Sequence, residues 1–156
     1  MNHPETPAFD PDGFELEHFL PYRLSLLTNT VSQGIACSYN DPHQISVTEW
    51  RILAVLGHFP GLTASELVAR TAMDKVSISR AVKTLETKGL LRRETDRGDR
   101  RRMRLHITEG RGRQVMEHVV PMALDYERRL LECLSEKETK ALDRIITKLQ
   151  RQSESL

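Results

Sequence analysis

Two short helices separated by about three residues constrain the fold of this chain more than any other feature of its sequence. A Thr63-x-x-Glu66 capping box predicts a helix over 63–71, because its hydroxyl and carboxylate can bond backbone N–H groups at the helix start. Asp74 is a favoured N-cap residue and predicts a second helix over 74–88. This arrangement is typical of a helix-turn-helix, in which the second helix enters the major groove of DNA.

A β-hairpin is predicted directly after the helix pair. Residues 90–94 and 103–107 have the pattern of two short strands, and the polar turn 95–102 joins them. A hairpin in this position makes the unit a winged helix. The predicted fold class is therefore mainly α with a small β-hairpin wing.

Further helices are predicted on both sides of the winged unit. Capping boxes begin at Ser46 and Ser135, and Thr108 is expected to cap a long helix. Because the apolar stripes of the flanking helices exceed what a small winged helix needs to cover, we expect them to pack against a second copy of the chain. The predicted organisation is an irregular acidic arm (1–13), an N-terminal dimerisation helix (14–42), a winged helix-turn-helix domain (46–107) and C-terminal dimerisation helices (108–156).

Positive charge is concentrated in the winged unit, although the net charge of the chain is only +1. Residues 63–113 hold fourteen Lys or Arg against seven Asp or Glu, which leaves a balance of −6 for the rest of the chain. The densest segment, 92–104, has seven arginines and three acidic residues. Clustered arginine of this kind is typical of nucleic-acid binding. Charge alone leaves a solvated loop with local ion pairs as the alternative.

The predicted second helix has a short, polar and basic face opposite its apolar one. Arg80 can read guanine with two parallel hydrogen bonds, and Val76 can contact a thymine methyl group. In the wing, we expect an ion pair with Asp99 to hold the Arg101 side chain extended. The arginines of the wing can then reach a narrow minor groove, which attracts arginine side chains. The predicted DNA-binding residues are Thr63, Ser65, Lys75, Val76, Ser77, Ser79, Arg80, Lys83, Thr84, Arg97, Asp99, Arg100, Arg101 and Arg102.

Motifs for catalysis, cofactors and metals are absent from the sequence. The six histidines and two cysteines have no metal-ligand spacing, and there is no nucleophile elbow, phosphate loop or dinucleotide motif. We therefore predict no enzyme, no cofactor and no metal. No apolar run is long enough to span a membrane, and Cys37 and Cys133 imply no disulfide framework, so a cytoplasmic location is expected. Both cysteines are expected to be packed and inert.

Six segments of the chain form a recognisable pattern: 46–53 (SVTEWRIL), 63–67 (TASEL), 74–82 (DKVSISRAV), 85–90 (LETKGL), 99–102 (DRRR) and 105–110 (LHITEG). With these segments the chain resembles the MarR family of bacterial winged-helix regulators, over about residues 14–150. The resemblance implies an obligate homodimer whose first and last helices interlock, and whose two recognition helices and wings straddle a pseudo-palindromic operator. It matches Asp99 and Arg101 to the wing pair of the family and Arg80 to a frequent base-reading position. The arm at 1–13 lies outside the shared pattern.

The residues and the resemblance together predict a transcriptional regulator, more specifically a repressor that binds double-stranded operator DNA. A small, often aromatic, effector is expected to release it from the operator. The resemblance places the effector between the dimerisation helices and the winged helix. Polar residues that could border such a pocket are His18, Tyr22, Arg23 and Arg51. Two alternatives stay open: a redox regulator that senses oxidants through Cys37, and a winged helix that binds only protein.

Overall fold

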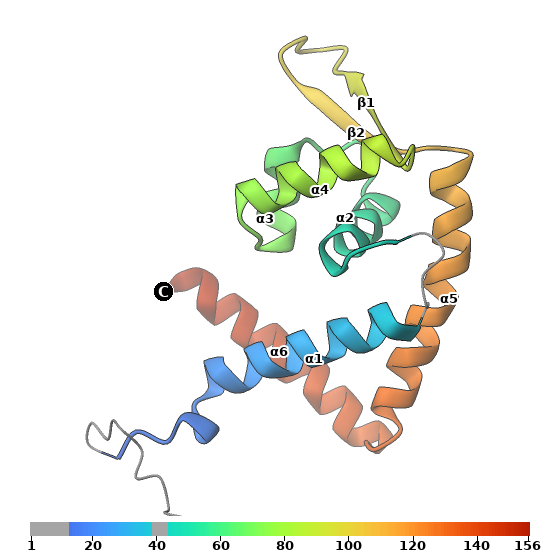
Figure 1. Ribbon diagram of the computed structural model, residues 1–156. Coiled ribbons are helices and arrows are strands. Elements are labelled where there is room, and N and C mark those ends of the chain that lie inside the picture. The colour runs from blue at the N-terminus through green and yellow to red at the C-terminus, as the bar shows by residue number, and fades with distance from the viewer. Residues whose placement is uncertain (1–12, 39–43) are drawn as a thin grey trace, which may run out of the picture.

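The computed structural model describes residues 13–38 and 44–156, so the predicted arm, apart from Gly13, lies outside the described residues. The described part confirms the predicted fold class: it is mainly helical, with one two-stranded antiparallel sheet (Figure 1). The elements in chain order are η1 (Leu16–His18), α1 (Leu20–Ser38), α2 (Val47–His58), α3 (Ala64–Thr71), α4 (Lys75–Thr87), β1 (Leu91–Thr95), β2 (Met103–Ile107), α5 (Arg111–Leu131) and α6 (Glu136–Ser155).

The three predicted capping boxes all form. In each box the hydroxyl of the N-cap residue accepts a hydrogen bond from the backbone N–H three residues later, and the glutamate there accepts one from the N-cap N–H. These bonds lower the pKa of two of the glutamates, Glu66 and Glu138, because they favour the charged carboxylate. The starts of α2, α3 and α6 are therefore fixed by residues only three positions apart.

The core of the winged unit lies between α2, α3 and α4, under the base of the β-hairpin. Its fully buried side chains include Leu53 of α2, Leu67 of α3 and Leu85 of α4. The N-terminal half of α5 adds Val115 and Val119 to the same core. Figure 1 shows that α5 then runs down from this unit towards α1 and α6, while the hairpin projects away from it.

The hairpin pairs in the register Leu91↔Ile107 to Thr95↔Met103. A short additional pairing, which the sequence analysis did not predict, joins Leu62 to Leu105: the Leu105 N–H donates to the Leu62 carbonyl at 2.9 Å. This bridge ties the base of the hairpin to the loop before α3.

Two predicted helix starts are wrong. The first long helix begins at Leu20 rather than near Phe14, because Pro21 is tolerated in a first turn but would break a helix interior. The helix after the hairpin begins at Arg111, and its N-cap is Gly110 rather than Thr108. The Thr108 hydroxyl lies two residues before this N-cap: it accepts the Gly112 N–H in the first turn of α5 and donates to the Gly89 carbonyl, both at 2.8 Å.

The flanking helices leave most of their apolar side chains exposed. On α1 the exposed apolar residues include Leu20, Leu24 and Leu27, and on α6 they are Leu142, Ile145, Ile146 and Leu149. α1 packs against the second half of α5, where the Tyr126 ring lies directly over Gly34. Within the described residues, no helix has both the length and the apolar character that crossing a membrane requires.

Candidate nucleic-acid interface

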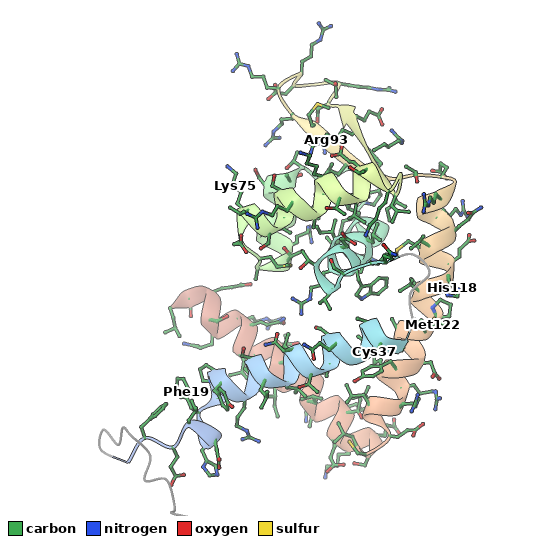
Figure 2. The ribbon with its side chains drawn as sticks, in the orientation of Figure 1. Phe19, Cys37, Lys75, Arg93, His118 and Met122 are labelled. Atoms are coloured by element: carbon green, nitrogen blue, oxygen red, sulfur yellow. The ribbon has the colours of Figure 1, made fainter. Side chains whose placement is uncertain are left out.

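The fourth helix, α4, separates its buried and exposed faces as predicted. Ile78 and Leu85 are buried in the winged core, whereas Arg80, Lys83 and Val76 are exposed. Figure 2 shows Lys75 on the outer side of this helix. The exposed face therefore offers three long cations, short polar side chains and one apolar contact within a single helix.

The N-terminus of α4 is fixed by Asp74. Its carboxylate accepts the Ser77 N–H at 2.8 Å and the Ser77 hydroxyl at 2.6 Å. The hydrogen bonds from Ser77 lower the pKa of Asp74. The hydroxyl proton of Ser77 is thus already donated inside the protein, and Thr84 likewise donates its own to the Arg80 carbonyl. Both side chains keep oxygen lone pairs that can accept hydrogen bonds from base or water donors.

The two residues predicted to contact DNA from the start of α3 differ in whether their hydroxyls are already hydrogen-bonded within the protein. Thr63 is half-buried, and its hydroxyl both accepts the Glu66 N–H and donates to the Glu66 carboxylate. Ser65, by contrast, is exposed and lines a hollow of about 220 Å³ between α3 and α4 together with Lys75 and Ser79. The structure therefore brings Ser65, Lys75 and Ser79 together, whereas it uses Thr63 as a helix cap.

The tip of the wing carries exposed arginines at 97, 100, 101 and 102. Figure 2 shows nitrogen-tipped side chains spreading outwards from this end of the hairpin. The predicted ion pair between Asp99 and Arg101 is wrong: Asp99 accepts the backbone N–H of Arg101 at 3.0 Å, and the described residues contain no ion pair between the two side chains. The carboxylate is used in this way because the turn leaves that N–H without a partner in the strand ladder.

Asp96 is the residue that organises the wing tip. Its carboxylate accepts the N–H groups of Gly98 and Asp99 at 2.7 and 3.1 Å and forms an ion pair with Arg104. The backbone bond from Gly98, the bond from Arg104 and the bond from Asp99 lower the pKa of Asp96. No local pattern in the sequence predicts this role, because Asp96 and Arg104 are eight residues apart and meet only across the hairpin.

A second ion pair that the sequence analysis missed joins the wing to the recognition helix. Arg93 of β1 donates from two nitrogens to the two oxygens of Glu86 on α4, at 2.7 and 3.0 Å. This two-bond pairing gives the wing a defined orientation relative to α4. No local spacing in the sequence signals it, because the two residues lie on different elements.

A narrow crevice of about 270 Å³ separates the first turn of α2 from α4. Arg80 and Thr84 border it from α4, and Ser46 and Thr48 border it from α2. We refer to this contact between α2 and α4 as the α2–α4 seam. The seam places the base-reading candidate Arg80 directly beside the start of α2.

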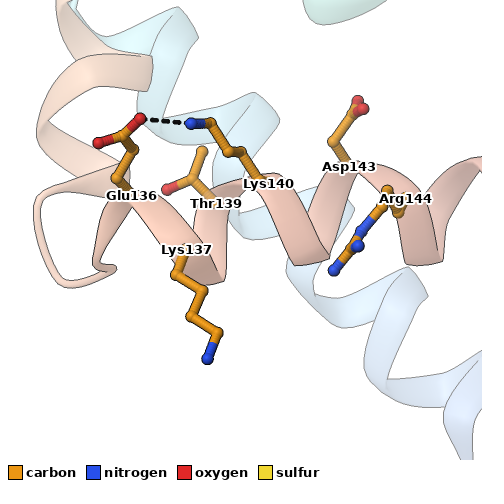
Figure 3. Close-up of a pocket in the computed structure, with 6 residues that line it drawn as sticks. All are labelled: Glu136, Lys137, Thr139, Lys140, Asp143 and Arg144. Carbon is orange, nitrogen blue, oxygen red and sulfur yellow. Dashed lines mark hydrogen bonds and ion pairs between the residues drawn. The ribbon is translucent and has the colours of Figure 1, made fainter.

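Two larger hollows lie away from this face. One of about 970 Å³ is lined only by polar residues of α6, among which Lys140 forms an ion pair with Glu136 (Figure 3). The other, of about 550 Å³, lies between the end of α2, the base of the hairpin and the first turns of α5, with Met116 and Val120 among its apolar residues. The first is an open helix surface, whereas the second lies at the junction of three elements.

The predicted burial of the two cysteines is wrong. Cys37 near the end of α1 and Cys133 after α5 are both exposed, unpaired thiols. Each lies near the end of a helix, and the Cys133 thiol donates to the Leu130 carbonyl at 3.4 Å. Among the described residues, no group of three or more His, Cys, Asp or Glu could hold a metal ion.

Of the residues named for an effector pocket, only Arg51 joins two elements: it donates from α2 to the Ser32 hydroxyl of α1 at 2.7 Å. His18 is exposed and pairs with Glu15 at 2.7 Å, and Tyr22 and Arg23 are exposed on α1. The structure therefore does not bring these four residues into one cavity in the described chain.

Sequence comparison matches the profile of the MarR family to residues 43–102. A protein of Thauera aromatica named for transcriptional regulation of the hcr operon is 34% identical over 101 residues, which is 65% of this chain and 60% of that protein. The HTH-type transcriptional regulator TtmR of Methylorubrum extorquens is 30% identical over 102 residues, which is 60% of this chain and 52% of TtmR. The chain thus spans between half and two thirds of the length of these relatives.

Solved structures match a larger part of the chain. A MarR/EmrR family transcriptional regulator from Acinetobacter sp. ADP1 has 25% identity and a TM-score of 0.82, and the match covers 92% of this chain and all of that one. The repressor CouR bound to a 23-mer DNA duplex has 22% identity and a TM-score of 0.75, covering 91% and 99%. Bordetella bronchiseptica BpsR, whose DNA binding is regulated by 6-hydroxynicotinic acid, has 19% identity and a TM-score of 0.76, covering 88% and 96%.

The structural likeness of CouR and BpsR to this chain supports a shared fold, and the family profile covers the segment from α2 to the wing tip. Residues 43–102 thus match the profile of the MarR family, and the fold of most of the chain is similar to that of a MarR/EmrR family transcriptional regulator.

Proposed function

We propose that the protein is a transcriptional repressor that binds a pseudo-palindromic operator in double-stranded DNA as a homodimer. The observation that carries the proposal is the exposed polar and basic face of α4, with Arg80 and Lys83, next to a wing whose tip bears four exposed arginines. A helix of this kind reads base edges in the major groove, and arginines on a projecting hairpin reach phosphates or the minor groove. The DNA-bound relative CouR, which is named a repressor, supports the same use of this fold.

The homodimer follows from unpartnered apolar surface. α1 and α6 expose leucines and isoleucines in stripes, and Ile145 keeps 53% of its surface exposed. Contiguous apolar surface of this extent marks a protein interface in a water-soluble chain. A second copy related by a two-fold axis would cover it with the same surface and place two recognition helices about 34 Å apart, which is one turn of DNA.

Selection of bound duplexes from a random pool tests this proposal, followed by titration of the selected duplex at two salt concentrations. We expect enrichment of an inverted repeat with half-sites about one helical turn apart. Binding without enrichment would reduce the protein to a charge-driven DNA binder. No binding at low salt would favour the alternative of a winged helix that binds only protein.

We further propose that a small aromatic effector lowers operator affinity. The cavity of about 550 Å³ supports this, because its walls come from α2, the hairpin base and α5, so that an occupant contacts both the winged unit and the helix that leaves it. BpsR, which 6-hydroxynicotinic acid regulates, provides a precedent on the same fold. An effector that binds one arrangement of these elements better than the other shifts the population towards it.

Screening aromatic acids against the complex of protein and selected duplex tests the effector proposal. A regulating compound is expected to weaken DNA binding by between about 5-fold and 150-fold, the usual range of coupling between two sites. Gly57→Leu places a side chain at a position where an added Cβ already comes within 3.2 Å of Met116, so this variant should lose the response and keep operator binding. A full response in Gly57→Leu would move the effector site away from this cavity.

The exposure of Cys37 favours redox control as a second candidate. In that case peroxide should weaken operator binding of the wild type, and Cys37→Ser should abolish this response. Cys133→Ser provides the matched control, since its thiol is equally exposed. An unchanged peroxide response in Cys37→Ser would exclude Cys37 as the sensor.

A further inference from the structure

Glu49 is the one charged residue that is buried in the described part of the chain, with 5% of its surface exposed. It belongs to the capping box of α2, where its Oε2 accepts the Ser46 N–H at 3.0 Å. The same oxygen accepts a hydrogen bond from Lys88 Nζ at 2.7 Å. A helix cap that could form from α2 alone is therefore shared with a cation from another element.

Lys88 ends the recognition helix. It is the C-cap residue of α4, and the chain turns after it through Gly89, at φ +71°, into the buried Leu90. Only 23% of the Lys88 side chain is exposed, in contrast to the fully displayed lysines on the outer face of α4. Its ammonium is directed into the protein, so it is not available to a DNA phosphate.

The Lys88 ammonium also binds the carbonyl oxygen of Gln44. Gln44 has a positive φ of +51°, a left-handed conformation that is unfavourable for residues other than glycine. It directly precedes Ile45, which is buried in the winged core, and Ser46, the cap of α2. Lys88 thus binds both the carboxylate and the strained backbone at the entry to α2.

We propose that Lys88 is a positioning residue of the DNA interface, which fixes the last turn of the recognition helix to the entry of α2 through Glu49 and Gln44. This inference rests on the proposed DNA binding. These contacts of Lys88 form a tie between the two helices, and Glu49, one of its partners, lines the α2–α4 seam together with Arg80. Because base readout requires a fixed helix, whereas attraction to phosphates depends mainly on charge, loss of the tie should reduce sequence discrimination more than overall DNA attraction.

The test compares Lys88→Met, which keeps the apolar stem, with Lys83→Met, which removes an exposed lysine of the same helix. For Lys88→Met we expect about a tenfold loss of affinity for the selected duplex, with affinity for a scrambled duplex and the salt dependence unchanged. For Lys83→Met we expect weaker binding to both duplexes. The slope of log affinity against log salt concentration (the salt slope) should fall by about one unit. Lys88→Arg should restore discrimination, because a guanidinium can bind the same two oxygens.

Three results would overturn the proposal. A reduced salt slope in Lys88→Met would make Lys88 a phosphate contact. An unchanged ratio between selected and scrambled duplexes would leave it a purely structural residue. A double variant, Glu49→Gln with Lys88→Met, that discriminates much less than Lys88→Met alone would show that the two residues act independently.

Amide hydrogen exchange in the absence of DNA tests whether Lys88 fixes α4 to the entry of α2, independently of whether the protein has the proposed function. In Lys88→Met the amides of the last turn of α4 and the first turn of α2 should exchange faster than in the wild type, and those of α6 should not change. Exchange identical to the wild type at both places would refute the tie, whether or not the protein selects a DNA sequence. If Lys88→Met leaves too little folded protein, the double variant with Glu49→Gln serves for this measurement, because it buries no unpaired charge.

Discussion

Arg104 and Asp96 form an ion pair at the turn end of the hairpin, and Arg104 also donates to the Gly61 carbonyl at 2.8 Å. One arginine therefore connects the wing tip to the loop that precedes α3. Gly61 has a φ of +81°, and a Cβ there would lie 3.2 Å from the His106 ring, so the backbone approaches the hairpin closely at this point. The orientation of the wing is set by this contact as well as by the strand ladder.

Asp96→Asn should destabilise the wing in a pH-dependent way. Because bonds from Gly98 and Arg104 lower the pKa of Asp96 in the folded protein, its carboxylate stabilises the fold above the unfolded pKa of about 3.9, and this is lost as pH falls through the lower folded value. In urea unfolding, the free-energy difference between wild type and Asp96→Asn should be largest near neutral pH and shrink towards zero in acid. Asp143→Asn, on the exposed surface of α6, provides the control. A difference that stays constant with pH would contradict the role of the charge.

Arg80→Ala should relax the base preference at one position in each half-site. Arg80 is the residue of the exposed α4 face that can bind guanine with two bonds, so its loss should cost about 1–3 kcal/mol against the preferred duplex. Competition between the selected duplex and single-base variants measures this. A variant protein that ranks all duplexes as the wild type does would exclude Arg80 from base reading.

Arg101→Ala should weaken binding with little change in base preference. The Arg101 side chain is exposed at the wing tip, and its position is set through its backbone N–H by Asp99. Removing one phosphate contact reduces the slope of log affinity against log salt by about one unit. Titration of the selected duplex at several salt concentrations checks this. A slope equal to that of the wild type would mean that Arg101 does not contact phosphate.

Helix starts were predictable from the sequence where their determinants are local. The capping boxes at Ser46, Thr63 and Ser135 depend on residues three positions apart, and all three form. The start of α5 was mispredicted because the hydroxyl of Thr108 bonds Gly89, which lies nineteen positions earlier.

In the wing, too, the sequence predicts features that depend on neighbouring residues but not contacts between distant ones. The existence of the wing and its exposed arginines were predictable, because strand alternation and charge density are properties of a continuous segment. The partner of each charged side chain was not: Asp96 meets Arg104, and Arg93 meets Glu86, only once the hairpin has its register and lies against α4. The Lys88–Glu49 contact, thirty-nine positions apart, had no sequence signal for the same reason.

Ile146→Glu should convert the proposed dimer to a monomer. The residue lies in the exposed apolar stripe of α6, where a charge would have to be desolvated on association. Analytical ultracentrifugation should show half the mass of the wild type, and affinity for the inverted repeat should fall at least tenfold. Lys148→Glu changes the charge of a neighbouring exposed position and should leave the mass unchanged. A dimeric Ile146→Glu protein would exclude α6 from the interface.

Gly34→Ala should loosen the packing of α1 against α5. A Cβ at Gly34 would lie 2.1 Å from the Tyr126 hydroxyl oxygen, so the ring must move, and overpacking of this kind costs about 1–3 kcal/mol. The free energy of unfolding from urea denaturation measures the loss. In a Tyr126→Ala background, where the ring is absent, Gly34→Ala should cost little. An equal cost in both backgrounds would show that the contact with Tyr126 is not the cause.

The length of α5 gives it a mechanical consequence. Its first turns lie in the winged core through Val115 and Val119, and its later turns carry the Tyr126 contact with α1. With 21 residues it forms a rod about 32 Å long. A tilt of about 6° at one end displaces the other by about 3 Å, close to the 3.4 Å rise between successive bases along a strand. If α5 moved as a rigid lever of this length, a side-chain adjustment near α1 would displace α4 by about the spacing of one base step.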